Sequence, residues 1–384
     1  MKVLFDFQGL VQKHSGGSKM YFELMKHFPP EVTYEVGLRE CDNVHLQRLK
    51  LLDIPVVHDD MKDFCYGLNF PKKESLYRLY SKLFPGQTTW GRNRQYSIDL
   101  LKKQDFDIFH PTFLDDYFLP YLGKKPFVFH IHDMTTTVLT QYFSSSNDYQ
   151  TEKKKILASK AAHIIAVSEN TKKDVMAFLG IPEEKITVIY HGADDWDYTY
   201  QNKSLDYPYF LYVGGRQNYK YFEGMVTAMR DFFVHHDHIK LVVVGSAFTK
   251  EENEFIAKYG LTKNVVHQYA NDNELFNLYH HALGFIYPSL YEGFGIPILE
   301  AYKTECPVLL NDKSCFPEIA GEAAVYFNLD DTGSTLEDAL ERVLAMSDDE
   351  RAHLIARQKD RLRNYSWDKA ALQLTEVYNK ILNK

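Results

Sequence analysis

The sequence predicts an α/β protein of two domains, each a parallel sheet covered by helices on both faces. Short apolar runs rich in β-branched and aromatic residues alternate with helical patterns along the whole chain, which is typical of parallel sheets. The chain has 384 residues, enough for two domains that each bury a core. A polar and aromatic stretch without helical or strand period, residues 194–208, divides the apolar runs into two sets. We therefore expect two Rossmann-like domains joined by a hinge.

Each set of apolar runs predicts a sheet of its own. The expected strands of the N-terminal domain are 3–7, 108–110, 127–132, 163–167 and 186–189. Those of the C-terminal domain are 209–213, 241–244, 265–268, 284–287 and 308–310. We assign residues 1–195 to the N-terminal domain, 196–207 to the hinge and 208–365 to the C-terminal domain. The last helix, within 366–384, is expected to pack back on the N-terminal domain.

Composition argues against several classes of protein. A net charge of −8 is unlike that of a general nucleic-acid binder. No segment is apolar for long enough to span a bilayer, and Asp6 interrupts the N-terminal apolar run before it reaches the length of a signal peptide. Cys41, Cys65, Cys306 and Cys315 have neither metal-site spacing nor a disulfide framework. We expect a cytoplasmic protein without a bound metal.

Residues 292–300, with the sequence EGFGIPILE, carry the most functional information. They follow an apolar run and lead into a helix that Pro297 can begin, because the missing proline N–H would have no partner there. A helix start offers free backbone N–H groups and a positive dipole end, which suit an anion such as phosphate. Glu292 and Glu300 add acceptors for sugar hydroxyls. On spacing alone, an ordinary β–α junction with two solvated glutamates remains the alternative.

Two cations follow the expected strand 209–213, at the sheet edge where ligands bind in open α/β sheets. Arg216 can contact two oxygens at once and Lys220 adds a point charge, so the pair could hold a diphosphate without a metal ion. The alternative is a surface loop with ordinary basic residues.

The N-terminal domain places further residues at the same kind of edge. Gly16 and Gly17 follow the first expected strand and its loop, and His132 ends the strand 127–132. His132 lies closest to the expected cleft, although His130 and His110 compete with it for any role. A packed, hydrogen-bonded histidine without function is the alternative for all three.

Several common motifs are absent from the sequence. The first strand is not followed by G-x-G-x-x-G, and no G-x-x-x-x-G-K-[ST] or G-x-S-x-G occurs. The sequence therefore gives no support for a dehydrogenase, a P-loop kinase or a hydrolase.

The segments described so far resemble the family-4 retaining glycosyltransferases, which have the two-domain GT-B fold. Residues 292–300 are similar to the E-x7-E signature of that family. Other segments resemble further motifs of the family in the same order: 167–172, 181–186, 191–192, 316–324 and 365–368. The resemblance covers most of the chain from residue 107 onward. Tyr221 departs from it, because the family often has Asn or Gly after the matching lysine.

The resemblance implies a role for the basic pair and for residues of the N-terminal domain. Arg216 and Lys220 match the cations that hold the donor diphosphate and stabilise its charge as the glycosidic bond breaks, in place of a metal ion. His132 matches a histidine near the donor sugar and the acceptor. Gly16 and Gly17 match a turn that admits the donor phosphate or the acceptor.

The resemblance also implies how residues 292–300 bind the donor. Glu292 matches the glutamate that faces the sugar hydroxyls, and Glu300 matches the one that binds ribose. Backbone N–H groups next to Glu292 complete this part of the site: Gly293, Phe294 and Gly295. Recognition of the base is expected near residues 267–270.

The predicted function is retaining, metal-independent transfer of a sugar, a hexose, from a nucleotide-diphosphate sugar to a glycan or lipid-linked acceptor. The setting would be polysaccharide or glycoconjugate synthesis, with no cofactor besides the donor substrate. In this family a phosphate oxygen is thought to take the acceptor proton, so no side-chain base is required. Two alternatives stay open, a GT-B sugar-nucleotide epimerase and a non-catalytic sugar-nucleotide-binding protein.

Residues 71–103 form a basic stretch in an acidic chain, with eight basic and two acidic residues. Ser75 could cap a helix there, with Arg78 and Lys82 opposite an apolar face. That face has helical spacing and consists of Leu76, Leu79, Tyr80, Leu83 and Phe84. We expect it to pack on the core. The alternative is peripheral contact with an anionic membrane, at its inner face, or with a polyprenyl-diphosphate-linked acceptor.

Overall fold

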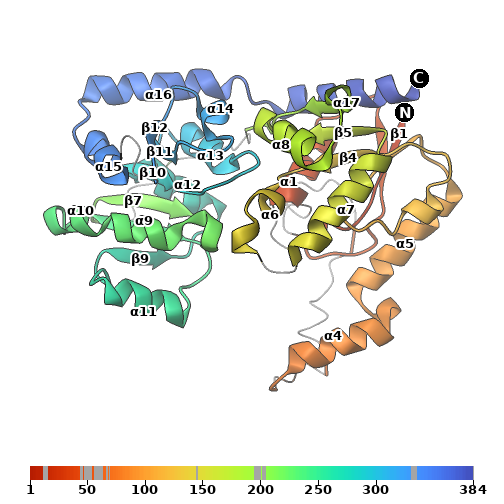
Figure 1. The fold of residues 1–384 in the computed structure, drawn as a ribbon, viewed down its shortest axis with the longest axis horizontal. Helices are drawn as coiled ribbons and strands as arrows, with labels where there is room; N and C mark the ends of the chain where they lie inside the picture. Colours follow the sequence, from red (N-terminus) through yellow and green to blue (C-terminus); the bar gives the residue numbers. More distant parts are fainter. Residues whose placement is uncertain are drawn as a thin grey trace.

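The protein folds into two lobes, with both chain ends on the N-terminal lobe (Figure 1). The structure is a computed structural model, and it describes residues 1–11, 16–43, 46, 54–55, 64–65, 68, 70–143, 146–193, 200, 205–329 and 335–383. The expected hinge, 196–207, lies outside the described residues except for Tyr200 and 205–207.

The N-terminal lobe contains two short parallel sheets that continue into each other. The first has the order β2-β1-β3 and the second β4-β5-β6, and a parallel bridge between Phe109 and Phe127 connects them. The strands are β1 (Lys2–Phe5), β2 (Thr33–Val36), β3 (Ile108–His110), β4 (Val128–Ile131), β5 (His163–Ala166) and β6 (Ile186–Val188). The helices are α1 (Gly16–Lys26), α4 (Lys73–Leu83), α5 (Thr89–Lys103), α6 (Thr135–Val138), α7 (Ser146–Lys160) and α8 (Glu169–Leu179).

Short 3-10 turns complete this lobe. They are η1 (Pro85–Gln87), η2 (Leu119–Tyr121), η3 (Thr140–Tyr142) and η4 (Glu183–Lys185). Strand β1 ends earlier than predicted, at Phe5. The carboxylate of the next residue, Asp6, accepts hydrogen bonds from the backbone N–H and hydroxyl of Thr112.

The C-terminal lobe contains one parallel sheet of six strands in the order β12-β11-β10-β7-β8-β9. Its strands are β7 (Tyr209–Val213), β8 (Lys240–Val244), β9 (Val265–Gln268), β10 (Gly284–Tyr287), β11 (Val308–Asn311) and β12 (Val325–Phe327). Its shorter helices are η5 (Asn218–Lys220), α9 (Phe222–Ala228), α10 (Arg230–His235), α13 (Ile296–Lys303) and α14 (Phe316–Ala320). The longer ones are α11 (Lys250–Lys258), α12 (Asp272–His281), α15 (Leu336–Leu344) and α16 (Asp348–Leu362).

Separate hydrophobic cores lie on the two faces of the C-terminal sheet, so helices cover both of its faces. This arrangement confirms the predicted fold class. Every expected strand is present, with ends shifted by at most two residues. Strands β2 and β12 were not predicted. Both lie at the edge of a sheet and are short, and β2 is only partly buried, so neither produces a long apolar run in the sequence.

The last helix, α17 (Trp367–Leu382), leaves the C-terminal lobe and packs against α1 of the N-terminal lobe (Figure 1). Its side chains Leu374 and Tyr378 are fully buried in the N-terminal core. The Tyr378 hydroxyl also lies 2.6 Å from Nδ1 of His110, next to β1. The helix therefore completes a core that begins with the first strand of the chain.

Helix α4 corrects the expectation that its apolar face packs on the core. None of its side chains is buried, and Leu76, Leu79 and Leu83 are about half exposed or more. Helical spacing identifies an apolar face but does not say what covers it. Ser75 is not the cap either, since the helix begins at Lys73. Among the described residues, no helix is long and apolar enough to cross a membrane.

Helix α17 provides a test of this domain arrangement. Leu374→Ala should lower the free energy of unfolding by about 2–5 kcal/mol, because the side chain is fully buried and its removal leaves a cavity. Leu372→Ala on the same helix is the matched control, since its side chain is 52% exposed and the change should cost less than about 0.5 kcal/mol. Denaturant unfolding followed by tyrosine and tryptophan fluorescence measures both. Equal effects would contradict the packing of α17.

Candidate active site between the two domains

The segment 292–300 connects β10 to α13 and forms a helix start, as its sequence indicates. Gly295 is the N-cap of α13 and has a φ of 99°, a conformation that favours glycine, and Pro297 lies in the first turn. The Ser314 hydroxyl donates to the Glu292 carbonyl at 2.8 Å, which fixes the loop before the helix. The free N–H groups of α13 are thus held at the carboxyl end of β10.

This loop touches the N-terminal domain backbone to backbone. A Cβ atom added to Gly293 would lie 1.7 Å from the carbonyl oxygen of His132, which follows β4. Only glycine permits so close an approach without movement of one of the loops. The Thr171 hydroxyl donates to the Gly293 carbonyl at 3.4 Å, from the first turn of α8. The structure therefore brings His132 and residues 292–295 together, although they are distant in sequence.

Lys220 and Glu292 form an ion pair at this junction. Lys220 Nζ lies 2.5 Å from Glu292 Oε1, and both side chains are less than one-fifth exposed. Burial alone would lower the pKa of Lys220, but the Glu292 carboxylate outweighs it, together with the Tyr219 hydroxyl and Asp133, so that the pKa is raised. The lysine is a permanent cation here, next to the start of α13.

Arg216 does not join Lys220 in the structure. Its guanidinium group makes a two-pronged contact with Glu252, at 2.7 and 2.9 Å, and also donates to the carbonyls of Ser246 and Ala247. The two cations predicted to act as a pair thus contact different carboxylates. Arg216 connects the loops after β7 and β8, and direct contact with a diphosphate remains a prediction.

Tyr221 accounts for the departure from the family pattern noted in the sequence. It adopts a φ of 55°, in the left-handed region that Asn and Gly tolerate best. Its ring lies over Gly224, where an added Cβ would come within 2.1 Å of the ring. The turn after Lys220 is therefore kept with a bulkier residue, because Gly224 leaves room for it.

His132 is the outermost of three stacked histidines. Its ring lies 5.1 Å from that of His130 and nearly parallel to it, and His130 in turn stacks at 5.8 Å on His110. His110 and His130 are buried, whereas His132 is only partly buried. Burial lowers the pKa of His132 to about 4 despite the nearby Asp133 carboxylate. At neutral pH it is an uncharged hydrogen-bonding group, 3.4 Å from the Tyr21 hydroxyl.

Gly16 and Gly17 begin helix α1, so they present its free N–H groups. Lys19, in the first turn, lies with Nζ 3.9 Å from Oε1 of Glu300 on α13. The Tyr279 hydroxyl donates to the other carboxylate oxygen of Glu300 at 3.4 Å. The first turn of α1 and helix α13 are therefore neighbours across the domain boundary. The predicted Gly16 and Gly17 lie in the same turn of α1 as Lys19.

Phe294 takes part in the site through its backbone only. Its side chain is buried and packs against His191, at 4.7 Å between ring centres, and against Tyr190. Its carbonyl accepts a hydrogen bond from the Cys315 thiol. This burial fixes the loop between Gly293 and Gly295.

Residues that the sequence did not single out hold the two domains together. The Glu318 carboxylate, from the C-terminal domain, accepts hydrogen bonds from the backbone N–H groups of Glu169 and Asn170 at 2.6 and 3.0 Å. These groups begin α8, so the carboxylate also meets the positive end of that helix. The Tyr291 hydroxyl donates to Asp174 on the same helix at 2.5 Å. The partners lie more than 100 residues apart, and no local pattern reveals them.

Lys154 is another residue that sequence reasoning missed. It is almost fully buried, and Nζ donates to the Asp133 carbonyl at 2.9 Å and lies 3.8 Å from its carboxylate. Burial lowers the pKa of Lys154, and Asp133 opposes the shift. The lysine thus fixes the loop that carries His132 and Asp133. A single lysine in the middle of α7 gives no signal in the sequence.

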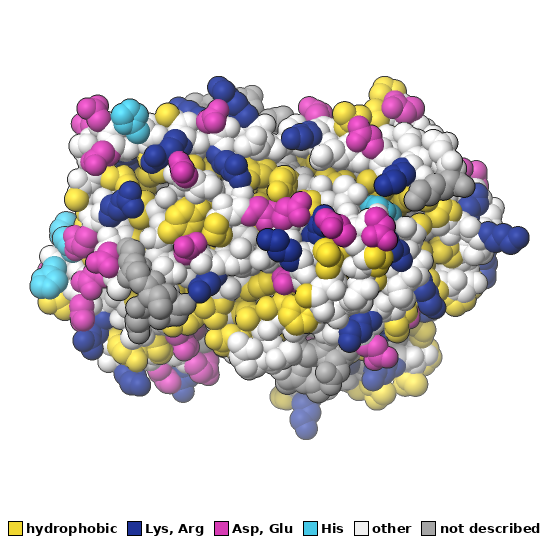
Figure 2. Space-filling view, turned by 45° about the horizontal axis from the view of Figure 1, so that its top comes forward, with side chains coloured by type: hydrophobic (Ala, Val, Ile, Leu, Met, Phe, Trp, Pro, Cys, Tyr) yellow, Lys and Arg dark blue, Asp and Glu magenta, His cyan; other side chains and the backbone are white. Residues whose placement is uncertain are grey.

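Charged side chains of both signs meet along the middle of the face shown in Figure 2. Among the described residues, no group of three or more His, Cys, Asp or Glu is arranged to hold a metal ion. The four cysteines are free, and Cys41, Cys306 and Cys315 are buried.

Two family models match the chain over adjacent ranges. Glycosyltransferase Family 4 matches residues 63–196, and Glycosyl transferases group 1 matches residues 197–361. The protein is a family-4 glycosyltransferase with the GT-B fold.

The following proteins, similar to this glycosyltransferase, each cover at least 81% of its length. An uncharacterized glycosyltransferase of Methanocaldococcus jannaschii is 24% identical over 81% of this chain and 87% of its own. O-antigen chain mannosyltransferase B of Escherichia coli is 23% identical over 98% and 99%. Sucrose-phosphate synthase of Thermosynechococcus elongatus superimposes with a TM-score of 0.70 at 16% identity, covering 100% and 99%. Anabaena HepE, in complex with UDP and glucose, gives 0.69 at 17% identity, covering 99% and 100%.

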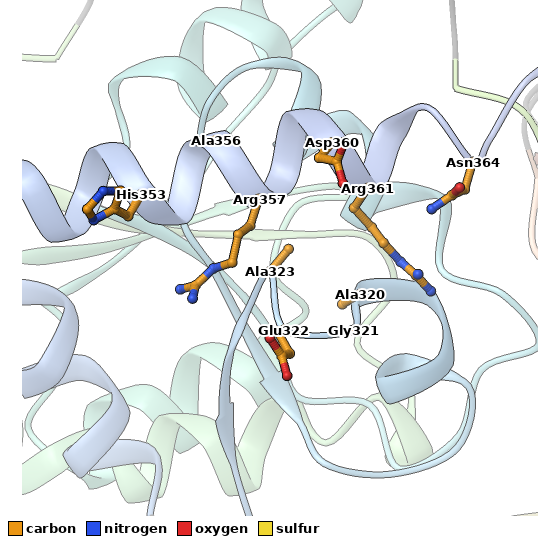
Figure 3. Close-up of a pocket in the computed structure, with 10 residues that line it drawn as sticks. All are labelled: Ala320, Gly321, Glu322, Ala323, His353, Ala356, Arg357, Asp360, Arg361 and Asn364. Atoms are coloured by element: carbon orange, nitrogen blue, oxygen red, sulfur yellow. The ribbon is translucent and has the colours of Figure 1, made fainter.

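A cavity of about 600 Å³ in the glycosyltransferase lies apart from the residues of the candidate active site (Figure 3). It is bounded by α16 and by the segment that follows α14, and its lining includes Glu322, His353 and Arg357. None of the predicted site residues lines it. Arg361, also in its wall, donates to the carbonyls of Glu318 and Ile319. The cavity is therefore not part of the candidate active site.

The contact at Gly293 generates a prediction for the glycosyltransferase. Gly293→Ala should lower the free energy of unfolding by about 1–3 kcal/mol and reduce kcat/KM, because the new methyl group would push the 292–295 loop away from His132. Gly86→Ala is the control, since an added Cβ meets nothing within 4 Å there. Denaturant unfolding and transfer assays measure the two effects. An unchanged Gly293→Ala enzyme would contradict the close approach.

The buried histidines of the stack, together with His191 beside His132, predict that acid destabilises the fold. Burial lowers the pKa of His110 and His191 to about 3 and of His132 to about 4, whereas an unfolded histidine has a pKa of about 6.5. Below about pH 6.5 the unfolded chain therefore binds more protons. The free energy of unfolding should fall towards pH 4 by up to about 1.4 kcal/mol per histidine and pH unit. Asp6, whose pKa burial raises to about 6, opposes this by one proton.

Denaturant unfolding over this pH range measures the slope. His130→Phe removes the central ring of the stack, whose pKa burial also lowers, and should make the slope smaller by about one proton. His238→Gln, which changes an exposed histidine outside the stack, is the control variant. The same slope in all three proteins would contradict the prediction.

Proposed function

We propose that this glycosyltransferase moves a hexose, with retention of configuration and without a metal ion, from a nucleotide-diphosphate sugar to a glycan or lipid-linked acceptor. The observation that carries the proposal is the Lys220–Glu292 pair beside the start of α13, held against the His132 loop of the other domain. A cation, free backbone N–H groups and a carboxylate are what a sugar diphosphate needs.

In the proposed reaction, the bond between the sugar C1 and the diphosphate oxygen breaks and its electron pair stays on the diphosphate. Lys220 and the N–H groups of α13 stabilise the charge that develops there. A diphosphate bound at Lys220 would share the lysine with Glu292, which leaves carboxylate lone pairs for the sugar hydroxyls. The acceptor oxygen forms the new bond to C1 on the face that the diphosphate leaves, and a phosphate oxygen takes the acceptor proton. His132 therefore stays a neutral hydrogen-bonding group near the acceptor.

Glu300 and the base-binding region define the nucleoside end of the proposed site. Glu300 is held by Lys19 and Tyr279, which leaves it oriented towards the start of α1. His267 bonds to the Gly245 carbonyl at 2.9 Å, and Tyr269 beside it is 70% exposed. An exposed ring next to fixed backbone groups suits a nucleotide base. We propose that ribose binds Glu300 and the base lies near residues 267–270.

Arg216 has a different proposed place in the reaction from the one that its spacing suggested. To reach the diphosphate it would have to leave Glu252, so we propose that it mainly holds the β7 and β8 loops in place around Lys220.

The names of similar proteins support a hexose and a nucleotide donor. O-antigen chain mannosyltransferase B acts on a glycan by its name, and HepE was solved with UDP and glucose. We propose a role in polysaccharide or glycoconjugate synthesis in the cytoplasm.

The deciding experiment incubates the purified glycosyltransferase with GDP-, UDP- and ADP-sugars. Protection from thermal unfolding identifies the base, since a ligand that binds only the folded state raises its stability. Product analysis with and without a glycan acceptor, in the presence of EDTA, then tests the reaction and its stereochemistry. Donor isomerisation without an acceptor would favour the epimerase alternative, binding without turnover a non-catalytic role, and loss of activity in EDTA a metal-dependent enzyme.

Lys220→Ala should lower kcat by about 10²–10³-fold, on the scale of the loss of one preorganised charge at a reacting oxygen. Lys250→Ala is the control. It also removes the charge of a lysine, but that side chain is 83% exposed on α11. Circular dichroism checks that both variants fold. Near wild-type turnover by Lys220→Ala would remove the lysine from the mechanism.

A further inference from the structure

Helix α4 has an apolar surface that is exposed in the part of the chain that the structure describes. Leu76, Leu79 and Leu83 lie at helical spacing on one face and are 47%, 53% and 64% exposed. Phe84, which ends the helix, is 54% exposed. In Figure 1 the helix projects from the N-terminal lobe, away from both sheets. Four large apolar side chains in a row are unusual on a surface without a partner.

The apolar residues of α4 lie on two flanks of the helix, and another part of the chain packs on one of them. The Phe64 ring lies 5.4 Å from Tyr77 and 5.1 Å from Tyr80, so it packs on one flank of α4. The leucines lie on the other flank. We name Leu76, Leu79, Leu83 and Phe84 the α4 surface.

Positive charge borders the α4 surface. Lys72 precedes the helix and Lys82 lies beside Leu79 and Leu83 on the helix surface, and both are exposed. The stretch 71–103 carries eight basic and two acidic residues, whereas the whole chain has a net charge of −8.

We propose that the α4 surface binds an anionic lipid bilayer. The leucines and Phe84 enter the boundary between headgroups and acyl chains, and the basic residues meet the lipid phosphates. A second copy of the chain fits less well, because a symmetric contact through this face would bring the bordering lysines of the two copies, Lys72 and Lys82, towards one another. Binding through one short helix is reversible, and it does not depend on the reaction that the enzyme catalyses.

The test uses the full chain and vesicles, without donor or acceptor. Wild-type protein should co-sediment with vesicles of equal parts phosphatidylcholine and phosphatidylglycerol, and not with pure phosphatidylcholine. Lys72→Glu/Lys82→Glu should weaken binding roughly tenfold or more, because each basic residue near an anionic surface contributes severalfold. Leu79→Ser/Leu83→Ser should weaken it comparably. Both pairs change exposed residues, so the fold should tolerate them, and circular dichroism verifies this.

Matched controls change the same residue types elsewhere. Leu372→Ser on α17 and Lys250→Glu on α11 alter side chains that are 52% and 83% exposed, and both variants should bind as wild type does. Absence of wild-type binding to anionic vesicles, or equal binding by wild type and the α4 variants, overturns the proposal. A dimer without lipid that Leu79→Ser/Leu83→Ser dissociates, seen by sedimentation velocity, would assign the surface to a second copy and overturn it as well.

Discussion

The candidate active site of this glycosyltransferase depends on the contact between two loops from different domains. Gly293 and the carbonyl of His132 approach so closely that no side chain fits between them, and Glu318 and Tyr291 hold the neighbouring helix α8 to the same lobe. Residues of both domains can face one bound ligand only because the loops meet at this junction. The starts of α1 and α13, and with them Lys19 and Glu300, face each other because the lobes meet here.

Charges at the junction are held in pairs that leave each loop rigid. Lys154 is buried beneath the loop of Asp133, and Lys220 is paired with Glu292 on the opposite side. Breaking one partner of such a pair leaves an uncompensated charge in a partly buried place, which costs more than an exposed ion pair contributes. An anionic ligand can replace a carboxylate as the partner of Lys220 without leaving that cation unpaired.

The sequence alone predicted much of the candidate site, for a local reason. A strand, a glycine turn and a helix start lie within a few residues of each other. The part of the candidate site that they form therefore comes from one short segment, 292–300. The same holds for Lys220 after β7 and His132 after β4. The sequence placed Arg216 with Lys220 because they are four residues apart, but Glu252, on a helix further along the chain, takes the guanidinium group. Spacing gives proximity along the chain and not the choice of partner.

The sequence by itself determined the fold class, nearly all the strands and the family, since apolar periodicity and ordered motifs are properties of short segments. Only the tertiary structure decided which surfaces those segments bury. It placed α17 in the N-terminal core, left the apolar face of α4 uncovered, and joined α8 to Glu318. The placement of α17 and of α8 depends on partners far away in the chain. For α4, the hydrophobic pattern shows that a face is apolar but not whether anything in the protein contacts it.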